Sequence, residues 1–428
     1  MEILVLGGGL AGLAAAQQLV AAGESVTLLE ARDRLGGRVL TERDPTLPYP
    51  IELSAEWLDP GGLARHLLDL QGSPVVAASG ERRRREQGAF VAVKEPYDKR
   101  LLRRLQRLGS RDRPLGRALA QCCSDPRWKA TVSELLNYVQ GFHAADPARV
   151  SLRWFLAAEA TASADASSSR AIEGADRVVE ALAQSLRHGA PEAIQLETIV
   201  RAVRWKKGRV RVTASTARGT ERYEGDRLIV TLPLALLKAG PPDPGRVRFQ
   251  PPLGKQRALD QLDTGQVCKV ILVFGRPFWK EIAPLEDLLM LQCVEQPFPT
   301  WWTMRPSEAP LLAGWVGGPL VRRLGGASGE RLLALAVDSL AAALGVPRSR
   351  VEQELVSWHS HDWRQDPFAR GAYSNVLSGG STAWRSLARP LEKTLFFAGE
   401  ATCAHGINAT MEGALASGYR VAREILGD

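Results

Sequence analysis

The sequence lacks any apolar run that approaches the ~18 to 20 residues needed to cross a membrane. Its start, MEILVLGGG, lacks the charged segment and small-residue cleavage site of a signal peptide, and no hydrophobic anchor follows EILGD at its end. We therefore expect neither a signal peptide nor a transmembrane anchor, and we expect a cytoplasmic location.

Cysteine is also scarce. The five cysteines form no CxxC pair and no ligand spacing with histidine; they are Cys122, Cys123, Cys268, Cys293 and Cys403. An odd number without such spacing argues against a disulfide framework and against a zinc site. We expect free thiols in a reducing compartment and no bound metal.

Positive charge is in excess, with a net charge of +8, but the excess is local. Arg82–Arg85 form one run, and a second basic stretch extends from Lys99 to Arg113. Leucines recur at helical spacing in the second stretch, which predicts an amphipathic helix with a solvated basic face. No aromatic residues are interleaved with the basic ones in the pattern of a nucleic-acid motif, so the composition argues against a nucleic-acid partner.

The N-terminal residues predict a strand, a glycine turn, a helix and a second strand. Ile3–Leu6 are continuously apolar, Gly7–Gly12 are glycine-rich, a helical segment follows from Leu13, and Ser25–Leu29 lead to Glu30. At 428 residues the chain is long enough for two domains and a core that encloses a cofactor. Together these elements form the fingerprint of a dinucleotide-binding unit.

Each residue type in this fingerprint has a physical role. Gly7 permits the tight turn, Gly9 lets the backbone approach a pyrophosphate at the helix N-terminus, and Gly12 allows close packing of helix on strand. Glu30 stands where an acid accepts hydrogen bonds from a ribose. The fingerprint alone does not separate FAD from NAD. The following segment, Ala31–Arg38, offers a Gly-Gly approach flanked by arginines, which suits a second phosphate or a ribityl chain.

Several blocks of the chain resemble the flavin-containing amine oxidase superfamily, which includes monoamine oxidases, polyamine oxidases, L-amino-acid oxidases and lysine-specific histone demethylases. The blocks LLEARDRLGGRV, IELSAEWL and FFAGEATCAHGINATMEGALASGYRVAREIL carry the resemblance, with VTLPLALLK, KVILVFGRPFW and WRQDPFARGAYSNV between them in the family's order. It covers nearly the whole chain and is weakest from about residue 76 to residue 170.

The resemblance implies an α/β fold in which a Rossmann-like FAD-binding domain is combined with a discontinuous α+β substrate domain. The FAD-binding domain would comprise residues 1–75, 170–245 and 370–428. The substrate domain would comprise residues 76–169 and 246–369.

The resemblance also implies FAD as the cofactor. The implied contacts are Gly7, Gly9, Ala11, Gly12, Glu30, Arg32, Gly37, Arg38, Glu56, Trp57, Val200, Glu400, Thr410 and Met411. Val200 would meet the adenine through its backbone, and Met411 would begin a helix whose N-terminus faces the flavin. Some monoamine oxidases attach FAD to a cysteine at the position of Ala372, so we expect noncovalent binding here.

Lys269 is the sharpest catalytic candidate. It opens Lys269–Phe274, a strand that is apolar on both faces, and a lysine there is costly to bury unless a partner or water satisfies it. Taken alone, the residues leave open that Lys269 simply begins the strand at the surface. The resemblance implies that it holds a water beside the flavin nitrogen that accepts hydride.

Tyr373, Thr410 and Trp363 complete the expected catalytic set. Tyr373 matches one wall of the family's aromatic cage, although a core tyrosine with a satisfied hydroxyl has the same signature. Thr410 stands where many monoamine oxidases have the second aromatic wall. A threonine at this position resembles polyamine oxidases and histone demethylases instead. Trp363 resembles a tryptophan packed near the flavin, and Trp301 and Trp302 fit either a substrate channel or the core. The six histidines show no catalytic-triad context.

These features together imply an FAD-dependent amine oxidase. A hydride equivalent would pass from a small-molecule amine to the cofactor, the resulting imine would hydrolyse to an aldehyde or ketone, and dioxygen would be reduced to hydrogen peroxide. Monoamines, polyamines and amino acids all stay open as substrates. The alternatives are another flavoenzyme on the same scaffold, such as a desaturase or a protoporphyrinogen oxidase, and a non-catalytic FAD-binding interaction module.

Overall fold

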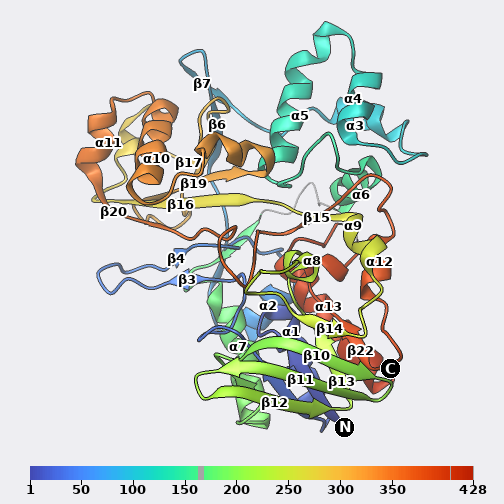
Figure 1. Cartoon of the computed structure of the whole chain (residues 1–428). Coiled ribbons are helices and arrows are strands. Elements are labelled where there is room, and N and C mark those ends of the chain that lie inside the picture. Colours follow the sequence, from blue (N-terminus) through green and yellow to red (C-terminus); the bar gives the residue numbers. More distant parts are fainter. Residues whose placement is uncertain (162–167, 405, 428) are drawn as a thin grey trace.

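A parallel five-stranded sheet joins the two ends of the chain in the computed structural model, which describes residues 1–161, 168–404 and 406–427 (Figure 1). Its strand order is β22 (Leu395–Phe397), β13 (Arg227–Val230), β1 (Glu2–Leu6), β2 (Ser25–Leu29) and β9 (Ile194–Gln195). Ile3–Val5 are buried, as the apolar run predicted, because helices and a second sheet cover both faces of the parallel sheet.

Three helices cover one face of this sheet. They are α1 (Leu10–Ala21), α7 (Asp176–Gly189) and α13 (Met411–Leu426), with α2 (Leu63–Leu70) packed beside them. A β-carbon at Gly418 of α13 would lie 2.3 Å from the Ala11 carbonyl oxygen of α1, so the first and last helices approach too closely for any side chain between them. The N and C termini consequently lie near the same sheet (Figure 1).

The other face is covered by a four-stranded sheet. Its order is β12 (Gly219–Gly225), β11 (Arg209–Thr216), β10 (Ile199–Lys206) and β14 (Arg248–Gln250). Alternate residues such as Val203, Val210 and Val212 point into a core that they share with Leu4 and Leu228 of the parallel sheet.

A mixed seven-stranded sheet forms the other half of the molecule (Figure 1). Its order is β20 (Leu355–Ser360), β16 (Val267–Phe274), β19 (Leu311–Gly317), β18 (Thr300–Trp302), β17 (Leu288–Gln292), β6 (Glu81–Glu86) and β7 (Ala89–Ala92). Helices α10 (Gly329–Leu344) and α11 (Arg348–Glu354) cover one face. Every residue of β16 is buried, including Lys269, for which the residues alone had left a surface position open.

A helical segment follows β7. It consists of α3 (Lys99–Gln106), α4 (Leu115–Cys122), α5 (Lys129–Gly141) and α6 (Leu152–Thr161). The predicted amphipathic helix is α3, in which Leu101 and Leu105 are buried and the basic face is outward. Helix α5 packs against β19, which places this segment over the end of the large sheet.

Short elements connect these parts. The paired strands are β3 (Thr41–Glu42) with β4 (Ile51–Glu52), β5 (Val75–Ala77) with β8 (Ser169–Ala171), and β15 (Leu262–Thr264) with β21 (Ser374–Val376). The remaining helices are α8 (Leu234–Lys238), α9 (Gln256–Asp260) and α12 (Ala383–Ala388). The expected α/β class is confirmed. We propose that the division between the parallel and the mixed sheet marks the two domains.

Within the described part of the chain, no single helix has the length and apolar composition to cross a membrane. Helices α10 and α11 meet that test only together, and the chain bends by 113° between them.

Candidate functional site

One cavity of about 510 Å³ lies between the parallel sheet, the mixed sheet and the helical segment. Its volume falls within the range of small-molecule and cofactor sites. It is lined by the glycine turn at residues 7–11, by residues 53–57 before α2, by Lys269 of β16 and by the residues around Tyr373, Glu400 and Met411. Apart from Gly12, which packs against Gly7 and does not line the cavity, the expected site residues therefore meet in one place, although they come from distant parts of the sequence.

The glycine turn has the geometry of a phosphate cradle. Gly7 adopts a φ of +110°, and a β-carbon at Gly12 would lie only 2.0 Å from the Gly7 carbonyl oxygen. Gly9 is the N-cap of α1, and no side chain caps this helix. The first N–H groups of α1 are therefore available to an anion that the positive helix end attracts.

Glu30 is buried at the end of β2 and is held in place by backbone. Its carboxylate accepts hydrogen bonds from the Gly8 N–H at 2.7 Å and from the Arg32 N–H at 2.9 Å. Arg32 in turn pairs with Asp366 at 2.5 Å. Burial would raise the pKa of Asp366, but hydrogen bonding from His361 and the charge of Arg32 outweigh it and hold the pKa at about 2.

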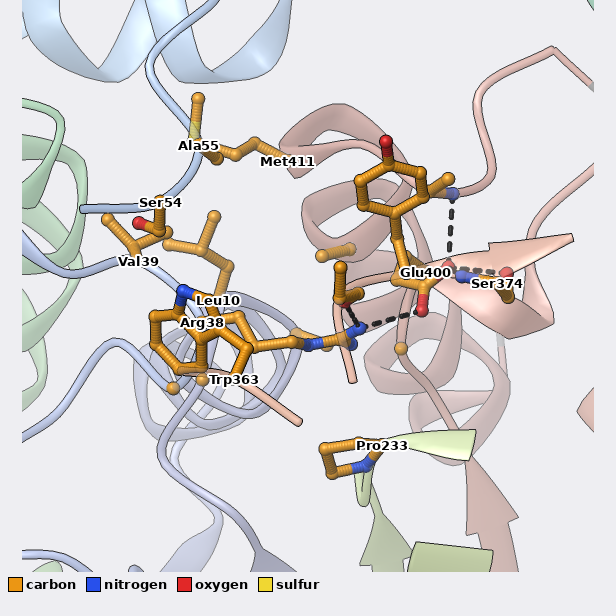
Figure 2. A pocket seen from close by; sticks show the side chains of 18 of the residues that line it. Leu10, Arg38, Val39, Ser54, Ala55, Pro233, Trp363, Ser374, Glu400 and Met411 are labelled. Atoms are coloured by element: carbon orange, nitrogen blue, oxygen red, sulfur yellow. Dashed lines mark hydrogen bonds and ion pairs between the residues drawn. The ribbon is translucent and has the colours of Figure 1, made fainter. Parts of the chain in front are cut away.

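A second ion pair crosses from the N-terminal to the C-terminal part of the site. The Arg38 guanidinium lies 3.1 Å from Glu400 and also donates to the Ala372 carbonyl oxygen. The other oxygen of Glu400 accepts from the Ser374 hydroxyl at 2.6 Å. Figure 2 shows this network on one side of the cavity, with Ser54 on the other side.

The remaining expected cofactor contacts also line the cavity. Val200 is buried on β10 and lines the cavity. The pairing of β10 with β14 begins only at Ala202, so β14 does not pair with the backbone of Val200. Gly37 lies against Gly9, and Met411 begins α13. These features together fit FAD. They are the bare glycine backbone, the helix N-terminus without a side-chain cap, the acid at the ribose position and the arginine on the other side.

Lys269 belongs to a buried charge cluster. Its ammonium lies 3.0 Å from the Glu56 carboxylate and donates to the Ser54 carbonyl oxygen at 3.2 Å. The second oxygen of Glu56 pairs with Arg170 at 3.3 Å, and all three side chains are at most 3% exposed. Burial raises the pKa of Glu56, but the two cations outweigh it, so the pKa lies below its ordinary value. Glu56, expected at FAD, thus directs its carboxylate at Lys269.

Glu52 adds a carboxyl group beside this cluster. It accepts from the Ala175 N–H at 2.8 Å and from the Thr41 hydroxyl, and burial raises its pKa to about 7. Tryptophans surround Lys269: Trp302 lies under the ammonium at 5.5 Å, and Trp57 and Trp315 flank Trp302. Trp301 instead points into the core of the mixed sheet.

Tyr373, Trp363 and Thr410 all line the cavity. The Tyr373 hydroxyl donates to the Phe142 carbonyl oxygen at 2.6 Å, and the Trp363 indole donates to the Leu53 carbonyl oxygen at 3.1 Å. Thr410 is the N-cap of α13, and its hydroxyl accepts from the Gly413 N–H at 3.0 Å. Its side chain therefore fixes the helix that points at the cavity.

One polar residue in the cavity wall was not predicted from the sequence. Glu159 of α6 lies in the cavity wall with Tyr138, Phe142, His143 and Trp154. Its side chain is 7% exposed. A signal was present, because Leu152 and Phe155 place Glu159 on the buried face of α6 at helical spacing.

The arginine run forms strand β6, in which the side chains find partners on both faces. Arg84 pairs with Glu134 at 2.7 Å, Arg83 pairs with Glu81, and Arg85 stacks on Phe90. The run is thus a partnered edge region of the mixed sheet.

Comparison with known sequences gives a family for the whole chain. The model of the family described as flavin containing amine oxidoreductase matches residues 10–426. Lysine-specific histone demethylase 2 of Homo sapiens is 27% identical over 99% of this chain and 53% of its own length. Polyamine oxidase 5 of Oryza sativa subsp. japonica is 28% identical over 99% of this chain and 87% of its own length. The chain spans about half the length of most of the demethylases that it matches.

Comparison with solved structures gives the same fold. A double mutant of putrescine oxidase with redesigned cofactor binding superposes with a TM-score of 0.81, at 22% identity and over 100% of this chain and 99% of that one. Cyclohexylamine oxidase from Brevibacterium oxydans IH-35A superposes with a TM-score of 0.80 at 20% identity, over 100% of this chain and 98% of that one.

Proposed function

The chain belongs to the flavin-containing amine oxidoreductases, whose cofactor is FAD, and from this premise we propose that it oxidises a small-molecule amine to an imine with dioxygen as the acceptor. The observation that carries the proposal is the buried Lys269–Glu56 pair, which lies in the same cavity as Tyr373 and the glycine turn. A cation this deeply buried beside a cofactor site is a candidate for chemistry rather than for stability.

We propose that FAD is held without a covalent bond. Ala372 lines the cavity and has no nucleophilic atom. The Cys403 thiol donates to the Gly413 carbonyl oxygen, and burial raises its pKa to about 11, so the thiol keeps its proton. Arg38, Glu30 and the first turn of α1 would hold the cofactor, and the N-terminus of α13 would stabilise negative charge on its flavin.

The protein supplies placement and electrostatics for the reaction. When bound, FAD accepts the hydride equivalent. Tyr373, fixed through the Phe142 carbonyl oxygen, forms an apolar wall that would direct the amine at the flavin. Thr410 adds no aromatic surface opposite Tyr373, which leaves the site wider than a cage of two aromatic rings.

Lys269 would position water. Its ammonium has three N–H donors, and Glu56 and the Ser54 carbonyl oxygen accept two of them. The third donor is left for a water molecule in the cavity. Such a water would hydrolyse the imine to an aldehyde or ketone, and reduction of dioxygen to hydrogen peroxide would complete the cycle.

Anaerobic mixing of the holoenzyme with monoamines, diamines, polyamines and amino acids tests the proposal. We expect bleaching of the oxidised flavin by at least one amine, followed by recovery of the yellow colour and hydrogen peroxide release when air is admitted. The Lys269→Met variant should slow reduction or reoxidation. No bleaching by any amine would contradict amine oxidation, and unchanged rates in the variant would contradict the role of Lys269.

A further inference from the structure

Glu159 lies in the wall of the cavity that the helical segment provides. Four carboxylates line the cavity among the described residues: Glu30, Glu56, Glu159 and Glu400. Three of them have arginine or lysine partners, in the pairs Glu30–Arg32, Glu56–Lys269 and Glu400–Arg38. Glu159 forms an ion pair with no lysine or arginine of residues 1–161, 168–404 or 406–427; its polar partners are two tyrosines and a histidine.

The partners of Glu159 hold the carboxylate without removing its charge. The Tyr97 hydroxyl donates to one oxygen, while Tyr138 at 3.4 Å and His143 at 3.0 Å contact the other. Burial and the nearby Glu159 charge raise the pKa of Tyr138, whereas the exposed Arg82 lowers it. Both tyrosines thus stay protonated donors. A buried carboxylate without a lysine or arginine partner is costly, so a bound cation would stabilise it.

Aromatic side chains surround this carboxylate on the cavity side. The His143 ring lies edge-on to Tyr138 at 5.2 Å and to Trp154 at 5.3 Å, and Tyr138 lies 5.7 Å from Phe142. Aromatic faces attract cations and exclude water, which strengthens a nearby charge–charge contact.

The place of Glu159 relative to Tyr373 follows from two neighbouring residues. The Phe142 carbonyl oxygen binds the Tyr373 hydroxyl, and the next side chain, His143, binds Glu159. One peptide unit, about 3.8 Å between Cα atoms, thus connects the two contacts. A short aliphatic chain that reacts beside Tyr373 can reach Glu159 with its far end.

We propose that Glu159 binds the distal ammonium of a diamine or polyamine and so sets the substrate class; this inference rests on the proposed amine oxidation. The reacting amine then lies beside Tyr373, and the second cation supplies the partner that Glu159 lacks. Glu159 acts on specificity and takes no part in hydride transfer.

The test compares α,ω-diamines of increasing length with n-alkylamines in which a methyl group replaces the distal amine. Wild-type holoenzyme, Glu159→Gln and the control Glu95→Gln are measured for kcat/KM in air and for apparent Kd in anaerobic flavin reduction. Glu95 is an exposed residue between β7 and α3 that pairs with Lys99. Wild type should prefer the best diamine over its matched monoamine by at least about ten-fold, because charge-assisted hydrogen bonds have this strength.

Glu159→Gln should lose at least about ten-fold on the diamine, through KM and Kd, and keep its rate on the monoamine, while Glu95→Gln should match wild type. Equal losses on both amines, or a wild type that favours the monoamine, would overturn the inference. Glu159→Asp retains the charge and retracts it by one methylene, so its best diamine should be longer. An unchanged length optimum in this variant would also overturn the inference. Failure of every amine to bleach wild type would refute the proposed function itself, a distinguishable result.

Discussion

Replacing Glu56 by glutamine keeps the shape of the side chain and removes the negative charge that is paired with Lys269 and Arg170. The three side chains are at most 3% exposed, with contacts of 3.0 Å and 3.3 Å. Removal of one partner from a buried ion pair costs about 3 to 5 kcal/mol, since the partner left behind has lost its water. Glutamine still offers an acceptor oxygen, so we expect the lower value, about 3 kcal/mol.

Glu52 gives this expectation a pH dependence. Its pKa is about 7, raised first by burial and also by the charge of Glu56, while Lys269 lowers it. In Glu56→Gln the repulsion between the Glu56 and Glu52 carboxylates disappears. Glu52 should then ionise more readily and replace Glu56 as the negative charge beside Lys269. The free energy of unfolding of the variant should therefore fall by the full amount, about 3 kcal/mol, at about pH 5, where Glu52 is protonated. At about pH 8 it should fall by less.

Urea unfolding, monitored by tryptophan fluorescence, measures the loss of unfolding free energy at about pH 5 and at about pH 8. The control is Glu224→Gln, which removes an exposed carboxylate from Arg209 and Arg211 and should leave the midpoint in place. Adding Lys269→Met to Glu56→Gln should recover part of the loss, because one unpaired cation disappears. A Glu56→Gln midpoint equal to that of the control at about pH 5 would refute the reasoning.

Three further predictions concern the same site. Burial raises the pKa of Glu52 to about 7 in the fold, above its ordinary value of 4.5, so about 3 kcal/mol of stability should disappear as the pH rises from 4.5 to 7, and Glu52→Gln should abolish this loss in pH-dependent urea unfolding. Thr410→Ala should cost about 1 kcal/mol and weaken FAD binding in titrations of the apoprotein, while Thr410→Ser should do neither. Gly12→Ala should prevent FAD retention on gel filtration, since its β-carbon would meet the Gly7 carbonyl oxygen at 2.0 Å; Gly61→Ala, with open space around it, should retain FAD.

The sequence predicted the N-terminal unit well because its signals are local. An apolar run, three glycines and an acid at the end of the next strand follow one another within 30 residues, and each has its own steric or electrostatic requirement. The strand that holds Lys269 was predictable in the same way, since it is apolar on both faces, but the residues alone left the burial of the lysine itself open.

The partners of these residues were not predictable, because they depend on how distant elements meet. Glu56 and Lys269 are 213 residues apart, and only the passage of the segment before α2 alongside β16 joins them. The Glu159 group draws on α5, α6 and two connecting loops in the region where the resemblance to the family is weakest. Thr410 could have been interpreted further, since threonine directly before a helix is the ordinary N-cap signal.

The closure of the parallel sheet by β22, and of its helical layer by α13, has a consequence for synthesis. The glycine turn leaves the ribosome long before β22 and α13, so a growing chain carries an unpaired edge on β13 and an apolar face on α1 that α13 does not yet cover. The cavity lacks the wall around Glu400 and Met411 during that interval. We therefore expect stable cofactor binding only after α13 has emerged, and a chain that stops before α13 should form most of the site without closing it.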